Sequence, residues 1–67
     1  MHQHSAATNA YEQATKLNPT KASAWFNLGL TYSIEGNRDG AIEAYQHLRK
    51  LDPAKADKLF NIAILPR

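Results

Sequence analysis

The sequence predicts an all-α protein built from antiparallel helix-turn-helix repeats, a short segment of an α-solenoid. The first observation behind this prediction is self-similarity: when residues 2–33 are aligned with residues 36–67, ten of the 32 pairs are identical. Background residue frequencies would give about two. The second is that proline and glycine divide the chain into four stretches of helical length. The third is that no stretch alternates apolar and polar residues with the period of two that is typical of a strand.

The first two helices are expected at residues 5–17 and 22–35. The first stretch is rich in alanine and stops before Asn18-Pro19, since proline cannot continue a helix and the residue before it avoids helical angles. Thr20 is the expected cap of the second helix. Gly36-Asn37 then provides a left-handed stop signal.

The third and fourth helices are expected at about residues 39–51 and 55–65. The third ends at Asp52-Pro53 just as the first ends at Asn18-Pro19, and Pro66 cuts off the fourth. Gly40 weakens the first turn of the third helix, because glycine is a poor helix former. The connections between the four helices are all tight.

One face of the second helix carries a characteristic set of residues at spacings i, i+3, i+4 and i+7, namely Trp25, Leu28, Gly29 and Tyr32. A glycine inside a helix costs about 0.8–1 kcal/mol relative to alanine, so we expect a neighbouring helix to approach Gly29 too closely for a side chain. The matching stripe on the third helix consists of Ala41, Tyr45 and Leu48, and it is followed by Pro53.

This set of residues resembles the tetratricopeptide repeat, a 34-residue helix pair with the pattern W-x2-L-G-x2-Y, then Ala, an aromatic residue, a small residue and Pro. The resemblance implies one domain over residues 1–67, with a complete repeat at 22–55. Residues 1–21 resemble the second helix of a preceding repeat, and residues 56–67 the first helix of a following one. The signature positions of the preceding helix are Ala7, Tyr11, Ala14 and Pro19.

Three departures from the family pattern put local packing in question, and one of them is Gly40 in the first turn of the third helix. Leu48 is larger than the alanine usual in the family, and Arg38 stands where an aromatic residue often sits. A plain four-helix bundle is the alternative, but it requires no 34-residue period.

In this register the first and last helices each lack a helix partner. Repeat proteins bury their core by stacking neighbours, so the apolar faces of these two helices are expected to be open. Two explanations remain: the chain is a fragment of a longer array, or another copy of the chain covers the faces as a homodimer or by helix exchange.

By resemblance, the protein is expected to be a non-catalytic protein–protein interaction scaffold. It would bind a peptide or helix on the concave face that the first helices of the repeats form. The alternative is a self-assembling structural module whose exposed terminal helices and apolar row mediate homo-oligomerisation. A purely structural explanation is that the apolar row packs against a neighbouring helix or subunit. The candidate partner-binding residues are Ser23, Phe26, Asn27, Leu30, Ile34, Lys55, Phe60, Asn61 and Ile64, with Ser33 at the edge.

Within this set, Phe26, Leu30 and Ile34 form a second apolar row at i, i+4 and i+8, and Phe60 and Ile64 repeat it one period later. The asparagine after each phenylalanine offers a hydrogen-bond donor and an acceptor to a peptide backbone. Some members of the family clamp the C-terminal carboxylate of heat-shock chaperones. Asn27 matches a clamp asparagine, but Asp57 and Asn61 occupy the matching places of the last helix, so no such clamp is expected.

Other classes of function find little support in the sequence. It contains no catalytic constellation, phosphate-binding loop or zinc spacing, and we expect no enzyme activity, cofactor or metal. His2 and His4 are a weak metal-binding pair at a frayed terminus, and His47 is expected to be solvated without a partner.

The net charge of +2 is low for a nucleic-acid-binding protein, although the second half is the more basic. No apolar run approaches the roughly 20 residues that span a membrane. With no targeting signal, the cytoplasm is the default expectation.

Overall fold

In the computed structural model, residues 6–64 are described, and within that range every regular element is a helix. The helices are α1 (Ala6–Leu17), α2 (Ala22–Ile34), α3 (Arg38–Leu51) and α4 (Pro53–Leu59), and α4 continues as a π-helix, η1 (Phe60–Ile64). The predicted all-α helical repeat is confirmed. The main difference is the last helix, which begins at Pro53, before residue 55, and changes its winding at Phe60.

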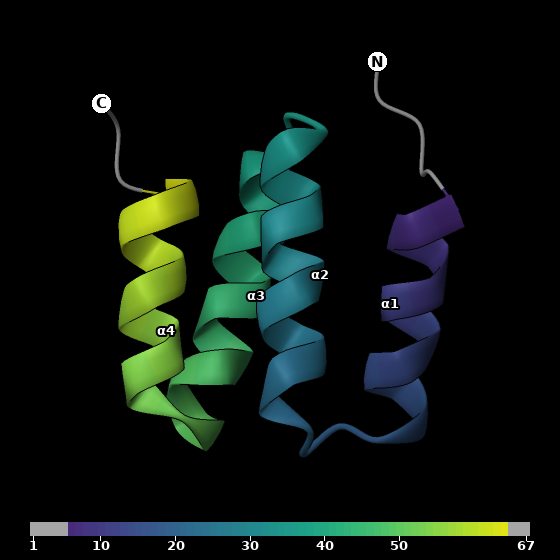
Figure 1. The fold of residues 1–67 in the computed structure, drawn as a ribbon, viewed down its shortest axis with the longest axis horizontal. Coiled ribbons are helices and arrows are strands. Elements are labelled where there is room, and N and C mark those ends of the chain that lie inside the picture. The colour runs from purple at the N-terminus through teal and green to yellow at the C-terminus, as the bar shows by residue number, and fades with distance from the viewer. Residues whose placement is uncertain (1–5, 65–67) are drawn as a thin grey trace.

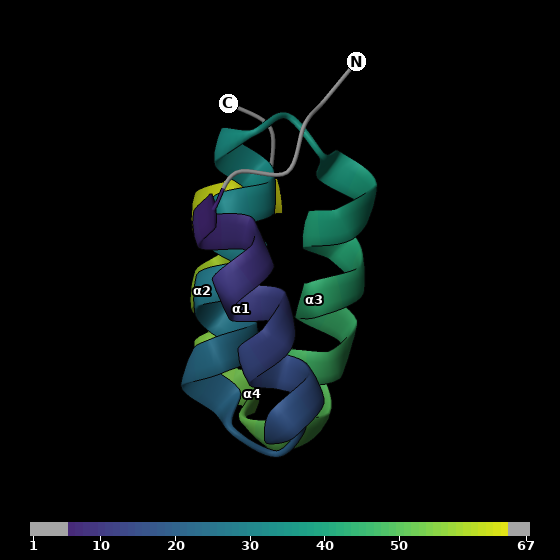
Figure 2. The same ribbon diagram turned by 90° about the vertical axis from the view of Figure 1, so that its right-hand side faces the viewer.

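Successive helices run antiparallel and together form a thin slab (Figure 1). Its Cα atoms span 33 × 30 × 13 Å. Helix α2 lies in the middle of the arrangement and packs against α1, α3 and α4. Within residues 6–64, α1 contacts α2 alone, whereas α4 packs against both α2 and α3. Viewed along the row of helices, α3 lies to one side of α2 (Figure 2).

The turn between α1 and α2 is not closed by Thr20 as predicted. The residue at the cap position is Lys21, and no side chain caps α2 there. The hydroxyl of Thr20 instead donates to Oδ1 of Asn18 at 3.2 Å. A side chain of α2 stabilises the turn instead: Nε1 of Trp25 donates a hydrogen bond to the carbonyl oxygen of Pro19 at 2.8 Å.

The turn between α2 and α3 follows the prediction, with Gly36 in the left-handed region at φ +80°. The side chain of Asn37 accepts a hydrogen bond from the backbone N–H of Gly40 at 3.0 Å and caps α3. The absence of a side chain at Gly40 also has a packing reason, since a Cβ there would lie 2.9 Å from ring carbons of Tyr32.

Helix α4 begins earlier than predicted because Asp52 caps it. The Asp52 carboxylate accepts from the backbone N–H of Lys55 at 3.2 Å. Pro53 then occupies the first helical position, where its missing N–H has no intrahelical partner to lose. The proline that ends α3 therefore also starts α4.

Replacing the cap of α3 should destabilise the fold. We expect Asn37→Ala to lower the free energy of unfolding by about 0.5–2 kcal/mol, since the Gly40 N–H loses its acceptor. Thr20→Ala is the matched control, and it should change stability by less than about 0.5 kcal/mol because its hydroxyl caps no helix. Urea unfolding followed by circular dichroism measures both. Equal losses would contradict the assignment of Asn37 as the cap.

The core lies where α2, α3 and α4 meet. Leu48, Ala56 and Leu59 are fully buried there. The predicted close approach at Gly29 is confirmed, because a Cβ on this residue would lie 2.6 Å from Cδ2 of Leu59. A side chain at position 29 would thus occupy space that the core already fills.

Two side-chain hydrogen bonds join α1 to α2 and to Glu35, which directly follows α2. The hydroxyl of Thr8, which is fully buried, donates to Oε2 of Glu35 at 2.6 Å. The hydroxyl of Tyr32 donates to Oε2 of Glu12, also at 2.6 Å. Burial, the hydrogen bond to Glu12 and the surrounding carboxylates raise the pKa of Tyr32 well above its usual range.

The raised pKa of Tyr32 predicts a loss of stability in alkali. An unfolded tyrosine ionises near pH 10, while the folded one keeps its proton, so stability falls as the pH rises above about 10. In Tyr32→Phe this fall should be shallower, and at neutral pH the variant should lose about 1.5 kcal/mol with the hydrogen bond. Urea unfolding at about pH 9 and about pH 11 tests this. The prediction is wrong if Tyr45→Phe, the matched control, flattens the pH dependence equally.

Candidate partner-binding face

The predicted apolar row of α2 is only partly open. Phe26 and Leu30 are half-buried and pack against the core of Leu48, Ala56 and Leu59. Ile34, at the end of the row, is 85% exposed. Phe26 and Leu30 therefore pack against the core and are only partly accessible to a partner, whereas Ile34 is largely exposed to solvent.

The second half of the row does not repeat the first. The ring of Phe60 packs against Tyr45 of α3, with centroids 5.3 Å apart and an interplanar angle of 46°. Ile64 is one of the candidate partner-binding residues, but it is only 5% exposed and belongs to the core. The cause is the π-helical winding of η1: an i to i+5 pattern changes the direction of each side chain relative to the α-helical register of α2.

Ser33 is occupied by a contact within the fold. Its hydroxyl donates to the carbonyl oxygen of Ala63 at 3.2 Å, which joins the end of α2 to η1. The other polar candidates are more accessible: Ser23 and Asn61 are exposed and Asn27 is half-buried. The backbone carbonyl of Asn27 accepts a hydrogen bond from the hydroxyl of Thr31 at 2.8 Å. This contact involves the backbone of Asn27 and not its side-chain amide.

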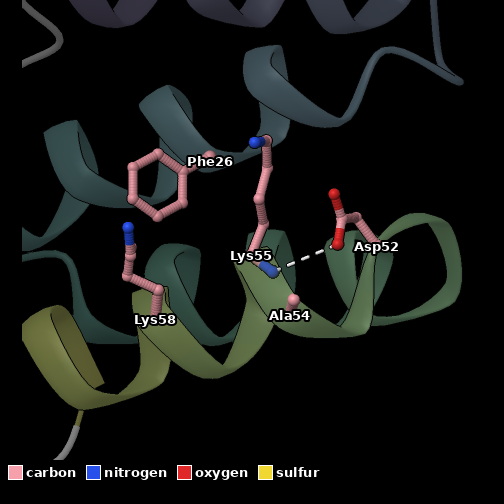
Figure 3. Close-up of a pocket in the computed structure, with 5 residues that line it drawn as sticks. All are labelled: Phe26, Asp52, Ala54, Lys55 and Lys58. Atoms are coloured by element: carbon pink, nitrogen blue, oxygen red, sulfur yellow. Dashed lines mark hydrogen bonds between the residues drawn. The ribbon is translucent and has the colours of Figure 1, made fainter.

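The structure brings two of the candidates, Phe26 and Lys55, together in one surface pocket between α2 and α4. The pocket has a volume of about 290 Å³ and is completed by Asp52, Ala54 and Lys58. The ring of Phe26 lies between the ends of the two lysine side chains, and Asp52 stands beyond Lys55 (Figure 3). Sequence reasoning missed Lys58, although its i+3 spacing from Lys55 places both lysines on the same side of α4.

The prediction that His47 has no partner is wrong. Its ring stacks on that of Trp25, with centroids 4.1 Å apart and an interplanar angle of 9°. Trp25 and His47 lie on different helices, so the stacked pair joins α2 to α3. The signal in the sequence was the position of Trp25 on the face of α2 that meets α3, but periodicity alone does not say which residue of α3 lies opposite.

Groups of three or more metal-binding side chains do not occur among residues 6–64. Nor is any helix in this range long and apolar enough to cross a membrane. The candidate metal pair His2 and His4, as well as Leu65 and Pro66 at the predicted end of the last helix, lie outside the described residues. Two exposed ammonium groups beside an aromatic ring can bind a ligand through charge and apolar contact.

Comparison with known proteins agrees with the helix pairing. A family model described as TPR repeat matches residues 3–33, which include α1 and nearly all of α2. A second, described as tetratricopeptide repeat, matches residues 22–55, which include α2, α3 and the start of α4. No curated protein and no solved structure matches the chain. The two matches, together with the antiparallel helices and the close approach at Gly29, show that this chain belongs to the tetratricopeptide repeat family.

Proposed function

We propose that this protein is a non-catalytic interaction module that binds a peptide segment of another protein on the face between α2 and α4. Tetratricopeptide repeats generally serve as protein–protein interaction modules. Helices α2 and α4 are the first helices of successive repeats in the register of the family match to residues 22–55. A peptide crossing both would contact two repeats at once.

The observation that carries the proposal is the pocket of about 290 Å³ on this face. It joins a half-buried aromatic ring, Phe26, to the exposed side chains of Ala54, Lys55 and Lys58. Binding sites in proteins typically combine an apolar surface with a few polar groups that fix orientation. The exposed Ile34 extends the apolar surface along the same helix.

A blocking substitution tests this location without disturbing the core. Ala54 is exposed and lies in the first turn of α4, where a glutamate is favourable for the helix. We expect Ala54→Glu to fill the pocket with a side chain that pairs with the lysines and competes with a ligand. Asn9→Glu, at an exposed position of α1, adds the same charge away from the pocket and is the matched control.

The measurement is selection of a randomised peptide library on the immobilised full chain. The wild-type protein and Asn9→Glu should enrich related peptides, and Ala54→Glu should enrich none of them. If the wild-type protein enriches no peptide, or if Ala54→Glu enriches the same peptides equally well, peptide binding at this face is refuted.

Self-assembly is the second candidate function. It is favoured by the different exposure of Leu28 and Ile62, which are equivalent positions of successive repeats. Leu28 is 3% exposed, whereas Ile62, one period later, is 50% exposed. Conversely, Ala7 is exposed in α1 while its equivalent in α3, Ala41, is fully buried. A second copy that placed its α1 against η1 would cover both faces, much as α3 packs against α2 within the chain.

Sedimentation equilibrium over a range of concentrations separates the two candidates. A self-assembling chain should show a mass that rises with concentration, and Ile62→Glu should abolish the rise. Gln46→Glu adds the same charge at an exposed position of α3, outside both α1 and η1, and is the control that should leave the rise intact. A constant monomer mass would exclude self-assembly but would leave peptide binding untouched.

A further inference from the structure

The pocket between α2 and α4 has a charge pattern that restricts its ligand. Two of its five lining residues, Lys55 and Lys58, carry ammonium groups, and one, Asp52, carries a carboxylate. The Asp52 carboxylate already accepts the backbone N–H of Lys55 at 3.2 Å as the cap of α4. The lining thus has a net charge of +1. Its one carboxylate, that of Asp52, is already engaged in capping α4.

The two lysines have no partner of opposite charge within the part of the chain that the structure describes. Both side chains are exposed and extend from α4 toward Phe26 (Figure 3). The ring of Phe26 lies between their ends, and it presents an apolar edge on which a hydrocarbon group can rest. The order of groups along the pocket is therefore positive, apolar, positive.

We propose, on the basis of the function proposed above, that this pocket binds an acidic peptide segment in which one apolar residue is flanked on both sides by glutamate or aspartate. The apolar side chain rests on Phe26, and the two carboxylates pair with Lys55 and Lys58. In an extended peptide, residues at i−2, i and i+2 project to the same side, so the matching pattern is acid-x-apolar-x-acid.

This site differs in composition from the clamp with which some members of the family hold the C-terminal carboxylate of chaperones. Asp57 and Asn61 occupy the clamp positions of the last helix, and neither lines the pocket. The apolar centre also distinguishes the ligand from a bare anion. A nucleic acid strand would supply negative charge and stacking, but it would not require two carboxylates at fixed positions around one aliphatic side chain.

The experiment uses three amidated, fluorescently labelled peptides and one oligonucleotide with the full chain. The first peptide carries one leucine with a glutamate two residues away on each side. The second has glutamine in place of both glutamates, and the third has the two glutamines and a free C-terminal carboxylate. A single-stranded oligonucleotide of similar charge is the fourth probe. Fluorescence anisotropy measures the affinity for each at low and at physiological salt.

We expect the glutamate peptide to bind tightest and to weaken with added salt. The double substitution Lys55→Gln with Lys58→Gln should lower its affinity by about 2- to 30-fold, the range for two exposed ion pairs. Arg49→Gln with Lys50→Gln removes the same charge from α3, where these residues line a different pocket with Gln46. This matched control should retain the affinity within about twofold.

Several results would overturn the proposal. Equal affinity for the glutamate and glutamine peptides would remove the acidic preference while leaving peptide binding intact, provided that Ala54→Glu still abolishes binding. Tightest binding of the third peptide would assign the pocket to a terminal carboxylate, and tightest binding of the oligonucleotide to a nucleic acid. Equal losses in the two double variants would show a general charge effect. If no peptide binds and the library selection also fails, the proposed function itself is wrong.

Discussion

The variant Leu48→Ala should lose about 2–5 kcal/mol of stability, although it introduces the residue that is usual at this place in the family. Leu48 is fully buried at the centre of the core, where α2, α3 and α4 meet. Truncation removes its transfer free energy and leaves a cavity, since the surrounding helices relax only in part. A domain of this length has roughly 3–10 kcal/mol in total, so a large part of the stability depends on one side chain.

Thermal and urea unfolding, followed by circular dichroism, measure this loss. Leu17→Ala is the matched control, because Leu17 is 83% exposed and its truncation leaves no cavity. It should change the free energy of unfolding by less than about 0.5 kcal/mol. If Leu48→Ala were as stable as the control, the small neighbours around it would have to close over the space, and our description of the core would be wrong.

The second large effect concerns Leu59 and Gly29, which approach each other across α2 and α4. We expect Leu59→Ala alone to lose about 2–5 kcal/mol, as for any fully buried leucine. Gly29→Ala alone should also destabilise the protein, because its methyl group would lie 2.6 Å from Cδ2 of Leu59. Combined with Leu59→Ala, however, the same methyl group has room and improves the helix by about 1 kcal/mol.

The sign of the Gly29→Ala effect should therefore reverse between the two backgrounds. Urea unfolding of the wild-type protein, both single variants and the double variant gives the coupling free energy, which we expect to be about 1–3 kcal/mol. Additive effects would mean that Gly29 is present for a reason other than its contact with Leu59. A matched cycle with Gly36→Ala, whose missing side chain has no atom within 4 Å, should show no coupling to Leu59→Ala.

Most of the architecture could be predicted from the sequence because proline and glycine clearly mark where the helices end. Pro19, Gly36 and Pro53 mark the turns, and they act through local backbone chemistry that does not depend on distant contacts. The close approach at Gly29 could also be predicted, since a glycine inside a helix has a measurable cost that packing must offset. Caps were harder to predict: Lys21, one residue after Thr20, stands at the cap position of α2, whereas Asn37 stands directly at the cap position of α3.

The candidate site could be predicted only in part. Phe26 and Lys55 were found from the repeat register, but Lys58 and Asp52 join them through the way α4 crosses α2. The register failed at Ile64 because the helix changes its winding at Phe60, and residue pattern does not distinguish an α-helix from a short π-helix. The stacking of His47 on Trp25 likewise depends on the pairing of two helices rather than on either helix alone.

The attachment of α1 through a single neighbour has a consequence for the energetics of opening. The most deeply buried side chains of α1 are two polar residues, Thr8 and Thr15, whereas the core where α2, α3 and α4 meet is built on leucine. Helix α1 is therefore the helix that leaves the fold at the lowest cost. Opening of α1 breaks the contacts of Thr8 and Tyr32 with their carboxylates but leaves the core around Leu48 assembled. The amide hydrogens of α1 should consequently exchange with solvent through a partial opening. Those of α2 and α3 should exchange only through global unfolding, and therefore more slowly.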